Sequence, residues 1–233
     1  MPLLSREDID VERKILASMA VVFDCDGVIF DSNDLKTKAF RESLSAYPRH
    51  TVEDFIRYHQ MYGGISRYVK FEKFFTDFIG IKPDPNTIDK LLYRFGVICR
   101  RLYRQVNITP GCCDVLSCLS KNYSLYVASG SDEHELRAVL EARDLSRYFS
   151  DVFGSPKTKD ECLQEIIRRA ATRRILFIGD ARTDWLAARK AGLTFIFMSE
   201  YSDAKEEMLL EAEKEGFPVI ETLETINGVL ANG

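Results

Sequence analysis

Short apolar runs that alternate with helical stretches limit what this chain can fold into. From residue 110 onward, each run is bounded by turn residues and separated from the next by a helical pattern. Because strands and helices alternate, we expect a doubly wound, Rossmann-like α/β fold with a parallel sheet covered on both faces. The predicted strands are residues 20–23, 124–128, 175–179, 194–198 and 218–220, and the predicted helices are 132–142, 159–171, 181–191 and 202–215.

The interval between the first two predicted strands is too long for an ordinary crossover. It carries four helical patterns, at residues 35–46, 52–61, 68–79 and 87–106, with breaks at Pro48, Gly63-Gly64 and the turn around residues 82–85. We therefore expect residues 32–108 to form a helical cap inserted after the first strand, over the carboxyl ends of the strands. Residues 1–31 and 109–233 would then form the Rossmann-like catalytic core.

The charge balance narrows the classes of ligand. With 32 Lys and Arg against 36 Asp and Glu, the net charge is −4, and no overall positive field favours nucleic acid. Residues 31–110 hold 14 basic and 9 acidic residues, a net charge of +5, so the remainder is acidic. A basic cap over an acidic core suits an anionic substrate above a cation-binding floor, although solvated helix faces carry such charges too.

Nothing in the sequence predicts a membrane protein. No apolar run approaches the ~18 residues that a spanning helix needs, and the charged first residues lack the apolar centre of a signal peptide. The six cysteines form no CxxC pair. We expect a cytoplasmic protein whose partner is a small molecule, without nucleic-acid or membrane partners. No heptad pattern predicts an oligomeric state.

Two aspartates follow the first predicted strand, at Asp24 and Asp26. Alternate side chains of an extended segment share a face, so both carboxylates would project toward one site. In open α/β sheets, the carboxyl end of a strand borders the ligand crevice. Two close carboxylates repel each other unless a cation or a shared proton intervenes. An Asx turn that closes the strand is the alternative interpretation.

A second acidic pair, Asp180 and Asp184, follows the predicted strand at residues 175–179. Either residue alone has a simpler explanation, because aspartate often caps a helix. Two strands that both end in acids make a coincidence of caps less plausible. Carboxylates without nearby His or Cys favour Mg²⁺ over zinc.

Hydroxyl and basic side chains complete a candidate phosphate site. Ser129 follows the predicted strand at residues 124–128, where its hydroxyl and the amides of Gly130 and Ser131 are placed to hold phosphate oxygens. Lys159 opens the next predicted helix, a position where a cation is slightly unfavourable and calls for an anionic partner. Lys157 competes with Lys159 for this role.

Together, these segments resemble a known family. DCDGV at residues 24–28, the strand end at Ser129, the helix start at Lys159 and GDARTD at residues 179–184 are similar to the four ordered motifs of the haloacid dehalogenase superfamily. The resemblance extends from about residue 21 to residue 198. The long insertion is similar to the helical cap of the β-phosphoglucomutase-like and phosphoglycolate-phosphatase-like branches.

The resemblance implies a role for each motif. Asp24 would be the nucleophile that forms an aspartyl phosphate, and Asp26 the general acid and base. Mg²⁺ would be held by the carboxylates of Asp24 and Asp180 and the backbone carbonyl of Asp26, with Asp184 supporting them from further out. Ser129 and Lys159 would neutralise charge on the transferring phosphoryl group, with Gly130 and Ser131 binding it.

One cap segment also resembles the family. Residues 64–67 are similar to the segment whose arginine grips the leaving portion of the substrate, so Arg67 would bind substrate, with Lys70 as the next candidate. A solvated charge at a helix start is the alternative for Arg67.

The resemblance implies a Mg²⁺-dependent phosphatase acting on a small phosphomonoester, such as a sugar phosphate or a phosphoglycolate-like compound. A phosphomutase of the β-phosphoglucomutase type and a catalytically silent phospholigand-binding protein are the alternatives, because fold alone does not decide function.

Overall fold

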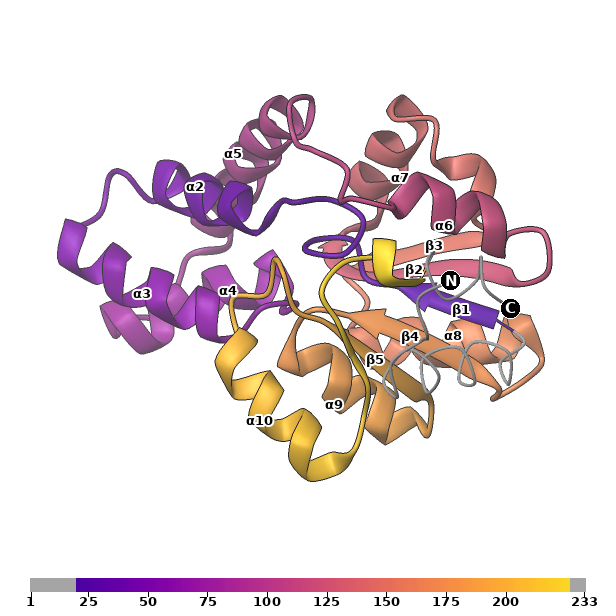
Figure 1. Ribbon diagram of the computed structural model, residues 1–233. Helices are drawn as coiled ribbons and strands as arrows, with labels where there is room; N and C mark the ends of the chain where they lie inside the picture. The colour runs from indigo at the N-terminus through magenta and orange to yellow at the C-terminus, as the bar shows by residue number, and fades with distance from the viewer. Residues whose placement is uncertain (1–19, 227–233) are drawn as a thin grey trace.

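The structure is a computed structural model that describes residues 20–226. Within these residues, six parallel strands form one sheet in the order β3-β2-β1-β4-β5-β6 (Figure 1). The predicted α/β sheet is confirmed. The strands are β1 (Ala20–Phe23), β2 (Ser124–Asp132), β3 (Asp151–Ser155), β4 (Ile175–Gly179), β5 (Thr194–Met198) and β6 (Val219–Ile220).

Helices cover both faces of the sheet. Alternate residues of β1 point to opposite sides: Val21 and Phe23 join one apolar core, and Ala20 and Val22 join the other. The first core includes α6 (Cys112–Leu119) and α7 (Glu133–Ala142), whereas the second includes α8 (Lys159–Ala170), α9 (Arg182–Ala191) and α10 (Lys205–Glu215). Because the central strands β1 and β4 are buried on both faces, each reads as a continuous apolar run.

Two elements, β3 and α6, were not predicted from the sequence. β3 contributes only Val152 and Phe153 as apolar residues of a strand pattern, because an aspartate begins it and a glycine and a serine end it. The short helix α6 precedes β2, and no helix was expected there. β2 also continues to Asp132 instead of ending at residue 128, although its pairing with β3 is irregular between Ala128 and Asp132.

The insertion between β1 and α6 consists of helices whose aromatic side chains pack together and continue the apolar core on one face of the sheet. Figure 1 shows them gathered at one end of the sheet. The single helix expected at residues 68–79 is an α-helix followed by a π-helical segment. The elements are α2 (Asn33–Ser43), α3 (Arg49–Met61), α4 (Arg67–Lys73), η1 (Phe74–Ile79) and α5 (Pro85–Tyr103). Phe40 lies at the centre of these aromatic side chains, with its ring centroid 5.3 Å from that of Phe55 and 4.4 Å from that of Phe95.

The two connections between the insertion and the sheet are hydrogen-bonded to each other. The backbone N–H of Asp31 donates to the carbonyl of Asn107 at 3.0 Å, and that of Thr109 donates to Ile29 at 3.0 Å. The insertion therefore joins the sheet through two adjacent segments. No helix of the described residues is long and apolar enough to span a bilayer.

Candidate active site

Asp24 lies directly after β1, at the end of the sheet that faces the insertion. Its backbone N–H donates to the carbonyl of Ile178 at 2.9 Å, and its side chain is buried. The chain then turns through Gly27, which has a φ of +78°, and a Cβ there would lie 2.1 Å from Oδ2 of Asp180. Only glycine lets the backbone pass so close to a second carboxylate.

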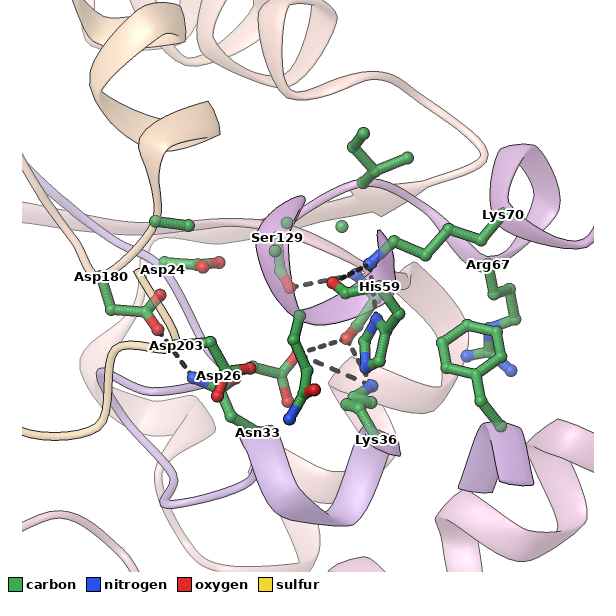
Figure 2. Close-up of a pocket in the computed structure, with 18 of the residues that line it drawn as sticks. Asp24, Asp26, Asn33, Lys36, His59, Arg67, Lys70, Ser129, Asp180 and Asp203 are labelled. Atoms are coloured by element: carbon green, nitrogen blue, oxygen red, sulfur yellow. Dashed lines mark hydrogen bonds and ion pairs between the residues drawn. The ribbon is translucent and has the colours of Figure 1, made fainter. Parts of the chain in front are cut away.

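Asp24, Asp180 and Asp184 form a buried acidic cluster, of which Figure 2 shows Asp24 and Asp180. One carboxylate oxygen from each lies within 4.8 Å of the others. The pKa of Asp24 is raised to about 7, because burial and the charge of Asp184 together outweigh the opposing charge of Lys159. Burial, with the charges of Asp184 and Asp24, also raises the pKa of Asp180 well above its ordinary value. Oxygen ligands that repel one another in this way fit Mg²⁺.

Lys159 is the basic residue of this cluster. Its ammonium lies 3.1 Å from Oδ1 of Asp24 and is also paired with Asp184. Although burial alone would lower the pKa of Lys159, the two carboxylates raise it, so the side chain is a fixed positive charge. Lys157 lies elsewhere, because its exposed ammonium pairs with Glu133 at 3.0 Å. Of the two lysines that compete in the sequence, Lys159 is the one beside Asp24.

Asp26 has a different environment, although it lines the same cavity. Its carboxylate accepts hydrogen bonds from Ser32 at 2.5 Å, from Ser131 at 2.6 Å and from the hydroxyl of Tyr103. The ammonium of Lys36 lies 3.6 Å away. Burial would raise the pKa of Asp26, but Lys36 and the three hydroxyl donors together lower it. Asp26 is therefore held as a carboxylate.

Ser129 and its neighbours lie beside the acidic residues. The hydroxyl of Ser129 is buried and accepts a hydrogen bond from the backbone N–H of Ser131 at 3.1 Å. Gly130 meets the insertion so closely that a Cβ on it would lie 2.1 Å from the carbonyl oxygen of Gly64. The sheet and the insertion thus touch backbone to backbone next to the site.

We expect Gly130→Ala to lower the free energy of unfolding by roughly 1–3 kcal/mol, because the new methyl group overlaps a backbone atom that cannot rotate away. Gly63→Ala is the matched control, since its Cβ would meet Ala181 at 3.4 Å, an ordinary contact. Denaturant unfolding of both variants measures the difference. Equal losses in the two variants would show that the close approach at Gly130 does not matter.

The insertion provides the other wall of a cavity of about 60 Å³. Arg67 lines it, with its guanidinium paired with Glu135 of α7 and lying 4.9 Å from the ring centroid of Phe95. His59 and Lys70 line the same wall, as Figure 2 shows. A substrate-binding role for Arg67 stays a prediction.

Several lining residues were not expected from the sequence. Asn33 donates to Oδ2 of Asp180 at 2.8 Å, and Lys36 donates to the hydroxyl of Ser131 at 2.7 Å. Both lie on α2, one helical turn apart, next to the site. Their position shortly after the DCDGV motif could have suggested that they lie near the site. The helical periodicity alone, however, does not show which face of α2 meets the sheet.

Comparisons with known proteins agree with this fold. The fold is similar to that of a predicted phosphatase from Clostridium acetobutylicum, with a TM-score of 0.72 and 18% identity over 93% of this chain and 99% of that one. It is also similar to CbbY from Rhodobacter sphaeroides in complex with phosphate, with a TM-score of 0.61 and 18% identity over 78% and 86% of the two chains.

The third similar structure is the hydrolase YfnB from Bacillus subtilis bound to magnesium, with a TM-score of 0.64 and 18% identity over 92% of this chain and 99% of that one. A comparison with curated proteins finds no match. The family model of haloacid dehalogenase-like hydrolases matches residues 19–192, most of the chain and all four motifs. The resemblance drawn from the motifs is thereby confirmed, and the chain belongs to the haloacid dehalogenase-like hydrolase family.

Proposed function

We propose that this hydrolase is a Mg²⁺-dependent phosphatase that cleaves a small phosphomonoester through an aspartyl phosphate on Asp24. The observation that carries the proposal is the buried carboxylate of Asp24, which contacts the ammonium of Lys159, lies within 4.8 Å of the carboxylates of Asp180 and Asp184, and lines a small cavity. The similar structures named as a phosphatase, a phosphate complex and a magnesium complex support it.

The acidic cluster fits one magnesium ion. The carboxylates of Asp24 and Asp180 and the backbone carbonyl of Asp26 would hold it, with Asp184 orienting them from behind. When bound, Mg²⁺ supplies positive charge that screens the phosphoryl oxygens from the attacking carboxylate.

The side chains then divide the work of phosphoryl transfer. Asp24 attacks phosphorus, and the bond from phosphorus to the leaving oxygen breaks. Lys159, the hydroxyl of Ser129 and the amides of Gly130 and Ser131 would hold the phosphoryl oxygens during both steps. In the second step, water attacks phosphorus, releases inorganic phosphate and regenerates the carboxylate of Asp24.

Asp26 would handle the protons. In the arrangement described, it is a carboxylate, the form that takes a proton from the attacking water. To serve as the acid in the first step, it must take up a proton and donate it to the leaving oxygen. The helices of residues 32–108 would act as a cap that excludes water from this cavity, and Arg67 would contact the portion of the substrate that is not transferred.

Phosphate release from a panel of phosphomonoesters tests the proposal. We would assay phosphoglycolate, sugar phosphates and nucleoside monophosphates with and without Mg²⁺. Mg²⁺-dependent release of inorganic phosphate from at least one small ester is expected. Isomerised ester without release would instead identify a phosphomutase, and binding without turnover would identify a silent phospholigand-binding protein.

We expect Asp26→Asn to lower kcat for alkyl phosphates by roughly 10²- to 10⁴-fold, the usual range for the loss of a general acid and base. The loss in the first step should be smaller for 4-nitrophenyl phosphate, whose leaving group needs no proton. A burst of nitrophenol in rapid-mixing experiments separates that step from hydrolysis of the phosphoenzyme. Unchanged kcat for both substrates would remove Asp26 from the proton transfer.

A further inference from the structure

The wall of the cavity that belongs to the insertion is basic. It presents the side chains of Lys36, His59, Arg67 and Lys70, and none of its lining residues is Asp or Glu. This wall faces Asp24 and Ser129 across the cavity (Figure 2). Whatever portion of a substrate extends beyond the phosphoryl group therefore meets positive charge and hydrogen-bond donors.

The four basic side chains differ in what already neutralises them. Lys36 forms an ion pair with Asp26, and Arg67 forms one with Glu135. Lys70 is 2% exposed, and its ammonium contacts Nδ1 of His59 at 2.7 Å and the carbonyl of His59 at 3.2 Å. Among residues 20–226, no carboxylate lies within 4.0 Å of it.

His59 also has hydrogen-bonding capacity to spare. With Nδ1 accepting from Lys70, its proton lies on Nε2, and this buried nitrogen has no partner in the described part of the chain. A buried donor without a partner is destabilising. Nε2 of His59, next to an ammonium that no carboxylate of the described residues neutralises, therefore points to an anionic ligand that accepts hydrogen bonds from both side chains.

The charges around Lys70 also favour an anionic ligand. The pKa of Lys70 is lowered to about 7, because burial and the charge of Lys36 together outweigh the opposing charges of Asp203 and Asp26. Burial and the neighbouring lysines likewise lower the pKa of His59 well below its usual value. A negative group bound between them would restore the proton of Lys70, so binding and protonation would favour each other.

The size of the cavity limits the ligand. One water molecule takes up roughly 10–15 Å³ of cavity volume. The cavity of about 60 Å³ therefore holds a phosphoryl group and a short chain.

We propose that Lys70 and His59 bind a second oxyanion, a carboxylate or a second phosphate, on the leaving portion of a short-chain phosphomonoester. The inference rests on the proposed phosphatase function and makes its substrate class specific. It assigns recognition of this second oxyanion to Lys70 and His59, which pair with no carboxylate among the described residues. Arg67, which is paired with Glu135, would contact another part of the leaving portion.

Matched substrates and variants test this site. Phosphoglycolate and ethyl phosphate differ in a carboxylate, and ethylene glycol bisphosphate replaces that carboxylate with a second phosphate. Lys70→Met keeps the length of the side chain and removes its charge, whereas Lys73→Met removes an exposed lysine of the same helix that pairs with Asp77. The preference is the ratio of kcat/KM for an ester with a second oxyanion, here called the anionic ester, to kcat/KM for ethyl phosphate. We expect Lys70→Met to reduce this ratio by roughly 10- to 100-fold for phosphoglycolate or for the bisphosphate. Lys73→Met should leave the ratio unchanged.

The pH dependence separates binding from a structural role. Because Lys70 loses its proton as pH rises through about 7, the wild-type preference for the anionic ester should fall over that range. His59, Lys36, Asp203 and Asp26 face Lys70 in both proteins, so the profile of Lys70→Met should be flat if Lys70 is the titrating group.

Calorimetry on Asp24→Asn protein measures the same preference without turnover. Tighter binding of phosphoglycolate or the bisphosphate than of ethyl phosphate, lost in Asp24→Asn/Lys70→Met, supports the site even if no ester is hydrolysed. Hydrolysis of both esters with equal efficiency would keep the phosphatase and overturn the site. A preference that survives Lys70→Met, or the absence of any preference, would also overturn it.

Discussion

Asp24→Asn protein is expected to lose turnover by about 10⁴-fold or more while keeping its fold. The amide has nearly the same size as the carboxylate but is not a nucleophile toward phosphorus. Because Asp24 lies among Asp180 and Asp184, removing its charge relieves repulsion, so the melting temperature should stay the same or rise. Phosphate release and thermal unfolding measure the two effects.

The control for this prediction is a carboxylate outside the cluster. Asp160 lies on the surface and pairs with Lys190, so Asp160→Asn should retain wild-type turnover. If Asp24→Asn retained more than about one hundredth of the wild-type rate, the nucleophile would have to be another residue.

Removal of Mg²⁺ is the second change with a large expected effect. Chelation should abolish turnover, and added Mg²⁺ should restore it, because the acidic cluster otherwise repels a phosphate dianion. The ion should also stabilise the fold by about 2.7 kcal/mol at a concentration of 100 times its Kd. Asp180→Asn should lose most of this stabilisation. Full activity after exhaustive chelation would contradict the metal site.

The metal-free protein should also respond to pH. The folded-state pKa of Asp24 is raised from 3.8 to about 7. A raised carboxyl pKa contributes stability that is fully present below about pH 4 and is lost as pH rises through about 7. Mg²⁺ should offset this loss, so the melting temperatures with and without the ion should diverge as pH rises from 4 to 8.

The sequence predicted the strands that carry the catalytic motifs. β1, β4 and β5 have the predicted bounds because each is a continuous apolar run followed by a turn or an acid. β3 was missed because only two of its residues are apolar, and its pairing with β2 comes from the tertiary fold. A local sequence pattern predicts a strand that is apolar throughout more readily than a strand with few apolar residues, which depends on pairing with its neighbours.

In the site, too, local sequence patterns predicted some residues, whereas others are brought together only by the tertiary fold. The acids, Ser129 and Lys159 follow predicted elements, so their meeting at one end of a parallel sheet could be anticipated. Ser131 was expected beside the phosphate, but its hydrogen bond to Asp26 was not, and Tyr103 reaches Asp26 only through the packing of α5. Lys36 and His59 likewise reach the cavity only through the packing of the insertion's helices.

Covalent labelling tests the central claim most directly. Wild-type protein mixed with Mg²⁺ and a labelled aryl phosphate would be quenched in acid within the first turnover, reduced with borohydride and mapped by mass spectrometry. We predict one modified residue, Asp24, converted to homoserine in the wild type and unmodified in Asp24→Asn. Turnover with the phosphoryl group on another residue, or with no phosphoenzyme in quenched or steady-state samples of wild type and Asp26→Asn, would contradict the account.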